Sequence, residues 1–420
     1  MPVGSTASAK RARRLAEDSA PLYSCDQLTP QLCDLRVTNG TLTIRGLSLR
    51  YWEYDAPALT PGSESALLPI IMVHGGPGWS HHYMLPLKQQ ACRGRKVIFY
   101  DQVGAGLSQK PTSAKDSAPW LLTIPYYLEE LQFVADALLG GSQPFHLLGS
   151  SWGTVVAQEY ALQTPPPAQL ASLVLSGPLS DGQFYIESQW DPIEGGLGTL
   201  PLFTQQRIHH LERTPKGFET QEYALLNERL ESAFTVRTYP APECFQTAAS
   251  LMNEEIYVGM QGESEFTIGG VLEFWSVTAE LHRVRTPTLL THGSFDTMRP
   301  PVLRAMHAAL PHAKVVLMPR SGHCSMIDDP GLMNDEIAAF LDCVESGAAA
   351  VACTAGGELG DPSALRMASP HALSPTLGLV LLLAGLVLLA PLATSSFRCR
   401  STRSKRTQRE ATRNGAMTMT

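Results

Sequence analysis

Short apolar runs recur along the chain, and segments with helical periodicity, such as 127–139, separate them. A short apolar run bounded by turn residues is typical of a buried strand, because a buried helix needs more residues. Strands that alternate with helices predict an α/β fold with a mostly parallel, doubly wound sheet and helices on both faces. The expected strands lie at 70–73, 97–100, 145–148, 173–176, 288–291 and 315–318.

Two regions depart from this alternation. Residues 35–54 predict antiparallel edge strands with a turn at Asn39-Gly40, a strong hairpin signal. Asn39-Gly40-Thr41 also matches a glycosylation sequon, but we expect the turn to account for these residues. Between residues 177 and 285 the strand pattern lapses, and we predict an inserted helical cap. Helical patterns there cover 205–211, 221–232 and 244–254.

The C-terminal part of the chain differs from a plain soluble enzyme. Residues 372–397 carry no charge, and this length is sufficient to cross a bilayer. Residues 398–420 contain seven Arg or Lys against one Glu, so this tail is strongly basic although the whole chain has a net charge of −7. We predict a C-terminal transmembrane helix that acts as a single-pass anchor, flanked by a basic tail. The acidic remainder of the chain argues against binding to nucleic acid.

The location of the predicted catalytic domain depends on the N-terminus. No apolar segment typical of a secretory signal lies near Met1, so we expect a cytosolic domain, although the basic tail would then cross the membrane against the positive-inside rule. The alternative is a soluble protein in which 372–397 is a buried helix. The expected segments are an arm (1–33), a core in two parts (34–176 and 286–345), a cap (177–285), a flexible linker (346–371), the membrane segment (372–397) and the basic tail (398–420).

Candidate chemistry begins at the sequence Gly-Ser-Ser-Trp-Gly at 149–153, which fits the G-x-S-x-G nucleophile motif. An apolar strand pattern precedes it and a helical pattern follows it, so the chain must turn sharply at Ser151. Such a turn is strained, and Gly149 and Gly153 leave the space that it needs. The alternative is a turn without any chemical role.

A serine nucleophile needs a base and an acid that orients this base. Asp296 and His323 each follow an expected strand, and with Ser151 they keep the chain order Ser, acid, His of the α/β-hydrolase fold. We predict that these three residues form a catalytic triad. The rival acids and histidines are Asp328, Asp329, His81, His82, His209 and His210.

The glycine-rich sequence His-Gly-Gly-Pro-Gly at 74–78 leaves the first expected strand. In acyl transfer the tetrahedral intermediate carries an oxyanion, and backbone amides stabilise it. We expect one amide from Trp152, directly after the nucleophile, and one from Gly76. This chemistry implies no metal and no organic cofactor.

Cysteine spacing adds no further site. The eight cysteines include no C-x-x-C pair, so the sequence predicts neither a zinc site nor a disulfide framework. We expect Cys324, beside His323, to be a small residue of the active-site loop rather than a nucleophile.

Residues 34–343 resemble the proline iminopeptidase family of α/β-hydrolases. The resemblance is carried by His-Gly-Gly-Pro-Gly at 74–78, by Tyr-Asp-Gln-Val-Gly-Ala-Gly-Leu-Ser at 100–108 and by the nucleophile motif continued to Thr154. The sequences at 80–83 and 260–266 are similar to the branch that contains the tricorn-associated aminopeptidase and the L-amino-acid amidases.

This resemblance implies release of an unblocked N-terminal residue, often proline, from a peptide or an amino-acid amide through an acyl-enzyme intermediate. A cap glutamate of the family binds the substrate ammonium, and Glu265 matches it. A second acid usually follows the catalytic Asp, and here Thr297 occupies that position. Two alternatives stay open: an esterase or other acyl hydrolase on the same scaffold, and a non-catalytic binding protein with a hydrolase fold. The sequence leaves the oligomeric state open.

Overall fold

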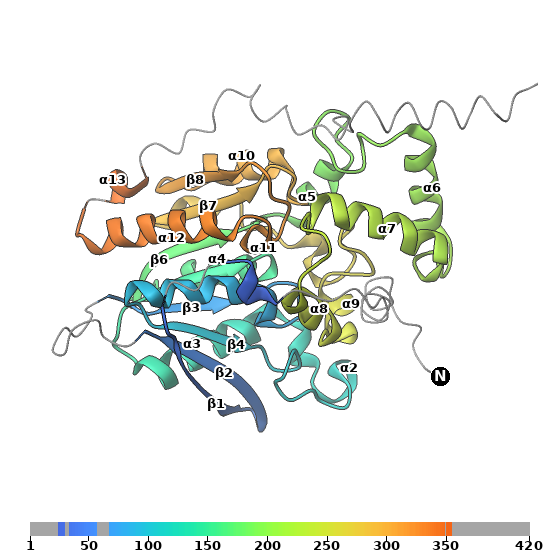
Figure 1. Ribbon diagram of the computed structural model, residues 1–420. Helices are drawn as coiled ribbons and strands as arrows, with labels where there is room; N and C mark the ends of the chain where they lie inside the picture. Colours follow the sequence, from blue (N-terminus) through green and yellow to red (C-terminus); the bar gives the residue numbers. More distant parts are fainter. Residues whose placement is uncertain (1–23, 30–32, 57–66, 349, 355–420) are drawn as a thin grey trace, which may run out of the picture. The chain divides into compact units, whose positions relative to one another are not determined.

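The computed structural model describes residues 24–29, 33–56, 67–348 and 350–354. Within these ranges, strands lie at the centre and helices lie on both faces, as Figure 1 shows. The predicted membrane segment 372–397 and the basic tail lie outside the described residues. Within the described part, no helix combines the length and the apolar character that a membrane crossing requires.

An eight-stranded sheet has the order β1-β2-β4-β3-β5-β6-β7-β8. Strands β1 and β2 are antiparallel to each other, β2 is antiparallel to β4, and the remaining pairs are parallel. The six strands predicted from the apolar runs are confirmed, with small extensions at their ends. The strands are β1 (Arg36–Ile44), β2 (Leu47–Asp55), β3 (Ile70–Val73), β4 (Val97–Asp101), β5 (Phe145–Ser150), β6 (Leu170–Ser176), β7 (Thr288–Gly293) and β8 (Ala313–Met318).

The turn predicted at Asn39-Gly40 is wrong. Asn39 and Gly40 lie in the middle of β1, paired with Trp52 and Tyr51 of β2. The hairpin turns instead at Arg45-Gly46, where both residues have positive φ, +49° and +78°. Two consecutive residues of positive φ match the twist of a two-residue hairpin, so the Arg-Gly pair provides the turn that the Asn-Gly signal suggested elsewhere.

Helices cover both faces of the sheet. On one face α3 (Ile124–Leu139), α4 (Trp152–Ala161) and α10 (Pro300–Ala309) pack against alternate strand residues such as Ile71 and Val73. On the other face the 3-10 helix η2 (His81–Arg93) and α12 (Pro330–Glu345) pack against Ile70 and Met72. This alternation follows from the period of two in a strand. Shorter helices are η1 (Cys25–Gln27), α2 (Ala114–Ser117), η3 (Pro119–Leu122), α11 (Ser325–Asp328) and α13 (Ala350–Thr354).

The chain between β6 and β7 forms the helices of the predicted cap, and Figure 1 shows α6 to α9 gathered at one end of the sheet. This region has its own apolar cluster, which includes Leu211, Leu230 and Phe266. The helix expected at 244–254 ends at Ser250, and the next helix begins at Glu254, where Asn253 accepts hydrogen bonds from its first amides and caps it. The cap elements are α5 (Gly182–Gln189), α6 (Leu202–Arg213), η4 (Gly217–Glu219), α7 (Gln221–Phe234), α8 (Glu243–Ser250), α9 (Glu254–Met260), η5 (Val271–Phe274) and η6 (Leu281–Arg283).

Three disulfides correct the expectation that the cysteines form no framework. They join Cys25 to Cys244, Cys33 to Cys92 and Cys343 to Cys353. The first two close separations of 219 and 59 residues, so no local spacing pattern could reveal them. Cys324 is a buried free thiol, and Cys399 lies outside the described residues.

Candidate active site

Ser151 lies on a sharp turn between β5 and α4, and its φ of 55° and ψ of −122° are strained for a residue with a side chain. Close backbone contacts on both sides of the turn require glycine. A Cβ on Gly149 would lie 2.2 Å from the carbonyl oxygen of Gly153, and one on Gly153 would lie 2.2 Å from that of Val73. Strain of about 1–3 kcal/mol at such a residue persists only when the surrounding structure enforces it.

The structure brings His323 and Asp296 together, as predicted. Nδ1 of His323 lies 2.7 Å from Oδ1 of Asp296, which also accepts the amide of Met298 at 2.9 Å. Nε2 of His323 is buried and has no hydrogen-bond partner among the described residues, so it is free to exchange a proton with a nucleophile. A Cβ on Gly177 would lie 2.7 Å from the imidazole, so this glycine leaves room for the ring.

The environment gives the two groups opposite pKa shifts. Burial raises the pKa of the Asp296 carboxyl, but attraction to His323 and His292 and the hydrogen bonds lower it below its usual range. Burial lowers the pKa of His323, but the charge of Asp296, their hydrogen bond and the charge of Glu265 raise it above its ordinary value. Asp296 is therefore an ionised partner that stabilises an imidazolium.

The glycine-rich loop after β3 lies beside Ser151. The amide of Gly75 donates to the Tyr83 hydroxyl at 2.6 Å, and a Cβ on Gly75 would lie 2.6 Å from the Cβ of Ser151. Gly76 has a positive φ of 47° and lines a pocket together with Ser151 and Trp152. The two predicted oxyanion donors therefore belong to residues that border the same cavity as the nucleophile candidate.

Gln102 holds these two donor segments together, a role that the sequence alone did not reveal. Its side-chain nitrogen donates to the carbonyl of His74 at 3.2 Å, and its side-chain oxygen accepts Nε1 of Trp152 at 3.0 Å. Nε2 of His74 in turn accepts the amide of Gln102 at 3.1 Å. The sequence did place Gln102 within the motif at 100–108 that resembles the family. Its contacts with both loops, however, depend on the order of the strands in the sheet.

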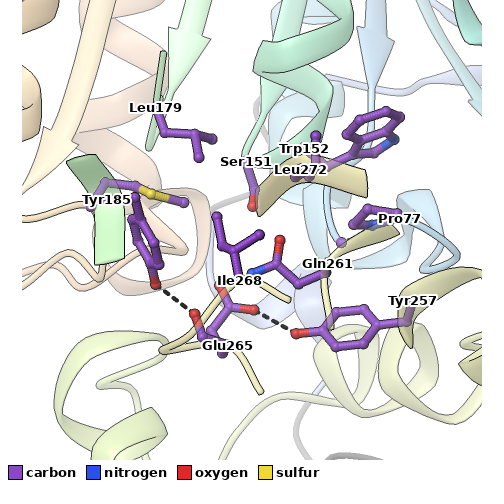
Figure 2. Close-up of a pocket in the computed structure, with 12 residues that line it drawn as sticks. Pro77, Ser151, Trp152, Leu179, Tyr185, Tyr257, Gln261, Glu265, Ile268 and Leu272 are labelled. Atoms are coloured by element: carbon purple, nitrogen blue, oxygen red, sulfur yellow. Dashed lines mark hydrogen bonds between the residues drawn. The ribbon is translucent and has the colours of Figure 1, made fainter. Parts of the chain in front are cut away.

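Ser151 opens into two pockets that also share Gly76 and Glu265. We name them the Tyr257 pocket and the Phe245 pocket; Figure 2 shows the first. The Tyr257 pocket is lined further by Pro77, Trp152, Leu179, Tyr185, Tyr257, Gln261, Ile268, Leu272 and Met298. The Phe245 pocket is lined further by Trp79, Tyr83, Thr235, Phe245, His323 and Cys324.

Glu265 is the one acidic residue among those that line these two pockets. Its Oε2 accepts the Tyr257 hydroxyl at 2.8 Å, and its backbone carbonyl accepts the Tyr185 hydroxyl at 2.5 Å (Figure 2). Burial raises the pKa of this carboxyl, while the charge of His323 and the bond from Tyr257 lower it in part. A cation in the pocket would offset the cost of burying the carboxylate.

Thr297, which occupies the position of the family's second acid, is fully buried. Its carbonyl accepts the side-chain nitrogen of Gln189 at 2.5 Å. Arg299, which is 4% exposed, donates to the carbonyl of Asp296 at 2.8 Å and therefore supports the loop after β7 that contains Asp296. Glu265 consequently has no second carboxylate beside it in either pocket.

The rival residues have other partners. Asp328 accepts the amides of Arg237, Thr238 and Gly322, so it holds loops together. Asp329 pairs with Arg320, and His209 stacks on Trp190. None of these residues lines either pocket that contains Ser151.

Within the described ranges, one cluster brings three possible metal ligands within 4.8 Å: His81, His82 and Asp101. Nδ1 of His81 bonds Oδ1 of Asp101 at 2.8 Å, and Nδ1 of His82 bonds Ser80 at 2.9 Å. The other carboxylate oxygen of Asp101 accepts the amide of Leu107. These contacts fit a hydrogen-bonded network that supports the loop after β4.

Comparisons with known proteins agree with the fold and the motifs. A family model described as the alpha/beta hydrolase fold matches residues 69–330. A proline iminopeptidase of Heyndrickxia coagulans is 30% identical over 308 residues, which cover 73% of this chain and 99% of the relative. A proline iminopeptidase of Saccharolobus solfataricus is 30% identical over 313 residues, which cover 74% and 94%.

A solved structure supports the same assignment. The crystal structure of proline iminopeptidase from Mycobacterium smegmatis is similar with a TM-score of 0.65 and 26% identity, and the match covers 74% of this chain and 100% of that one. The relatives are therefore matched over almost their whole length. This chain belongs to the proline iminopeptidase family, the serine aminopeptidases built on the α/β-hydrolase fold.

Proposed function

We propose that the chain releases the N-terminal residue of a peptide or an amino-acid amide through an acyl-enzyme intermediate. Ser151 Oγ attacks the carbonyl carbon while His323 Nε2 takes its proton, and Asp296 stabilises the imidazolium. The amides of Gly76 and Trp152 stabilise the oxyanion. His323 then returns the proton to the leaving amine, and water hydrolyses the acyl ester by the same route.

The observation that carries this proposal is the position of Glu265 in the cavity of Ser151. An exopeptidase must bind a free ammonium close to the scissile bond. A carboxylate that pairs with this ammonium away from water contributes about 1.5–3 kcal/mol. Because the pocket side chains other than Glu265 are neutral or apolar apart from His323, an N-terminal cation is the complementary ligand.

The two pockets suggest how a substrate is oriented. The Tyr257 pocket contains both proposed oxyanion residues, so the acyl part and its ammonium would lie there. The Phe245 pocket contains His323, which protonates the leaving amine, so the rest of the peptide would leave through it. Leu179, Ile268 and Leu272 make the acyl side apolar, which favours proline or another small or apolar first residue.

An esterase is the second candidate, and Thr297 is the observation that favours it. One carboxylate holds an ammonium less strictly than two, and the neutral Thr297 leaves uncharged acyl groups acceptable. The reaction steps at Ser151 and His323 would be the same, and only the leaving group would differ, an alcohol instead of an amine.

One set of assays separates these candidates. Proline amide and alanine amide should be hydrolysed, whereas their N-acetyl forms should react much more slowly, because they carry no cation for Glu265. Equal rates for free and acetylated amides, together with fast hydrolysis of simple esters, would favour the esterase. A fluorophosphonate probe should label Ser151; absence of labelling and of all turnover would favour the non-catalytic binding protein.

We also propose, from composition alone, that residues 372–397 anchor the chain in a membrane. A chain that ends at Ser369 should be soluble and active, because the described hydrolase fold ends before that residue. The full chain should remain with membranes through a carbonate wash. Full-length protein in the supernatant would refute the anchor without affecting the proposed reaction.

A further inference from the structure

We propose that Asn39 carries an N-linked glycan and that the catalytic domain matures on the non-cytosolic side of a membrane, in an oxidising compartment. The sequon and the disulfides carry this proposal independently of each other. Neither depends on the catalytic reaction, so the proposal stands or fails separately from the proposed reaction.

Asn39-Gly40-Thr41 is the single N-x-S/T sequence of the chain. The residue two positions after each of the other asparagines is neither Ser nor Thr; these are Asn227, Asn253, Asn334 and Asn414. The hairpin turn at Arg45-Gly46 removes the conformational explanation for the Asn-Gly pair. The tripeptide therefore has no structural role in a turn that would account for it.

The sequon lies on an accessible part of the molecule. Strand β1 is at the edge of the sheet, as Figure 1 shows, and residues 36–39 are exposed on both faces of the strand. Oδ1 of Asn39 accepts Nη2 of Arg50 at 3.2 Å, and Thr41 Oγ1 accepts Nη1 at 3.0 Å. Nδ2 of Asn39, the atom that a glycan would occupy, makes no hydrogen bond to any described residue, so a sugar there displaces no contact.

The three disulfides indicate the same compartment as the sequon. Disulfides persist in the oxidising secretory pathway and outside the cell, and they are rare in the cytosol. Of the seven described cysteines, six are paired. Two of the pairs, Cys25–Cys244 and Cys33–Cys92, involve the segment that leads into β1. The cytosolic location expected from the sequence does not fit this pattern.

The proposed orientation also satisfies the charge rule. With the catalytic domain on the non-cytosolic side, the basic residues 398–420 stay on the cytosolic side of the proposed anchor, as the positive-inside rule favours. A glycan on β1 has a physical use as well. The outer edge of a sheet has unpaired amides and carbonyls that can pair with another chain, and a bulky sugar would block this pairing.

The test is a glycosidase assay on the full chain expressed in insect or mammalian cells without an added leader. Digestion with peptide N-glycosidase F should increase its gel mobility by a single step, which corresponds to the loss of one glycan. Asn39→Gln and Thr41→Ala should abolish the step, whereas Thr41→Ser should keep it. Thr43→Ala changes an exposed threonine of the same strand outside the sequon, so it should leave the glycan in place.

Thiol labelling before and after reduction provides the second readout. Native chain should expose thiols of the six paired cysteines to maleimide only after reduction. An enzyme with intact disulfides and no glycosidase shift would refute the glycan. A chain with these cysteines reduced in the cell would refute the compartment, and a shift that persists in Asn39→Gln would refute the site. Thermal unfolding of each variant shows whether it folds.

Discussion

The sheet side and the cap side of the active site are built in different ways. On the sheet side, Ser151, Asp296 and His323 follow β5, β7 and β8, and the loops around them are fixed by backbone hydrogen bonds and close glycine contacts. On the cap side, Glu265 lies in a loop after α9, and two tyrosine hydroxyls from α9 and α5 hold it. The rigid part therefore contains the proposed reacting groups, and the helical insertion contains the group that would select the substrate.

This difference separates what each region controls. A change on the sheet side should affect all substrates, because every acyl transfer uses the same nucleophile, base and oxyanion donors. A change on the cap side should affect substrates with a free amine and leave others unaltered.

Replacement of Ser151 by alanine should reduce kcat on the order of 10⁶-fold for amides and esters alike, because the proposed nucleophile is lost. Labelling with a fluorophosphonate should also disappear, while the melting temperature should change little. Ser150→Ala is the matched control: Ser150 is the last residue of β5 and should retain activity within about tenfold. The opposite pattern, with Ser150 essential and Ser151 dispensable, would assign the nucleophile to the wrong serine.

Replacement of Asp296 by asparagine should reduce kcat by about 10⁴-fold, again for every substrate. The amide keeps the size of the carboxylate but does not stabilise an imidazolium, and it favours the wrong tautomer of His323. The comparison is Asp328→Asn, because Asp328 follows His323 closely but bonds backbone amides. Its loss should lower the melting temperature and leave kcat nearly unchanged. An equal loss of kcat in both variants would leave the acid unassigned.

The sheet side could be predicted from sequence because its determinants are local. Apolar runs locate the strands, parallel strands bring their carboxyl ends to one edge, and Asp296 and His323 each follow such an end. The prediction of a turn at Asn39-Gly40 was wrong because the chain adopts positive φ at Arg45-Gly46 instead. The identity of two residues does not by itself decide which of two positions forms the turn.

The cap side could not be derived in this way. The sequence matched Glu265 to a family position, but its contacts with Tyr257 and Tyr185 depend on how α5 and α9 fold against each other. Gln102 bridges two loops that meet only once β4 lies beside β3 in the sheet. The disulfide between Cys25 and Cys244 likewise joins distant segments, so only the folded chain shows it.

Replacement of Glu265 by glutamine should reduce kcat/KM for free-amine substrates by roughly 10- to 150-fold, which corresponds to about 1.5–3 kcal/mol. N-acetylated amides and plain esters should change by less than about threefold, because they carry no cation at this position. Glu263→Gln alters an exposed carboxylate two residues away and should have no effect on either class. If Glu265→Gln leaves the rates of both classes unchanged, Glu265 does not bind the substrate ammonium, and the esterase is favoured.

The smallest effect links the two sides through the pKa of His323. The charge of Glu265 is one of the causes that raise this pKa. With a neutral ester, the fall of kcat/KM at low pH, its acid limb, follows the protonation of His323 in the unbound enzyme. Glu265→Gln removes a negative charge that favours the imidazolium, so the acid limb should move to lower pH. A bound ammonium neutralises the same charge. The kcat limb of wild type with a free-amine substrate should therefore lie below the kcat/KM limb with the ester. If the two acid limbs coincide in wild type, the charge of Glu265 does not influence the pKa of His323. The cap side would then affect substrate recognition alone, and the sheet side the reaction alone.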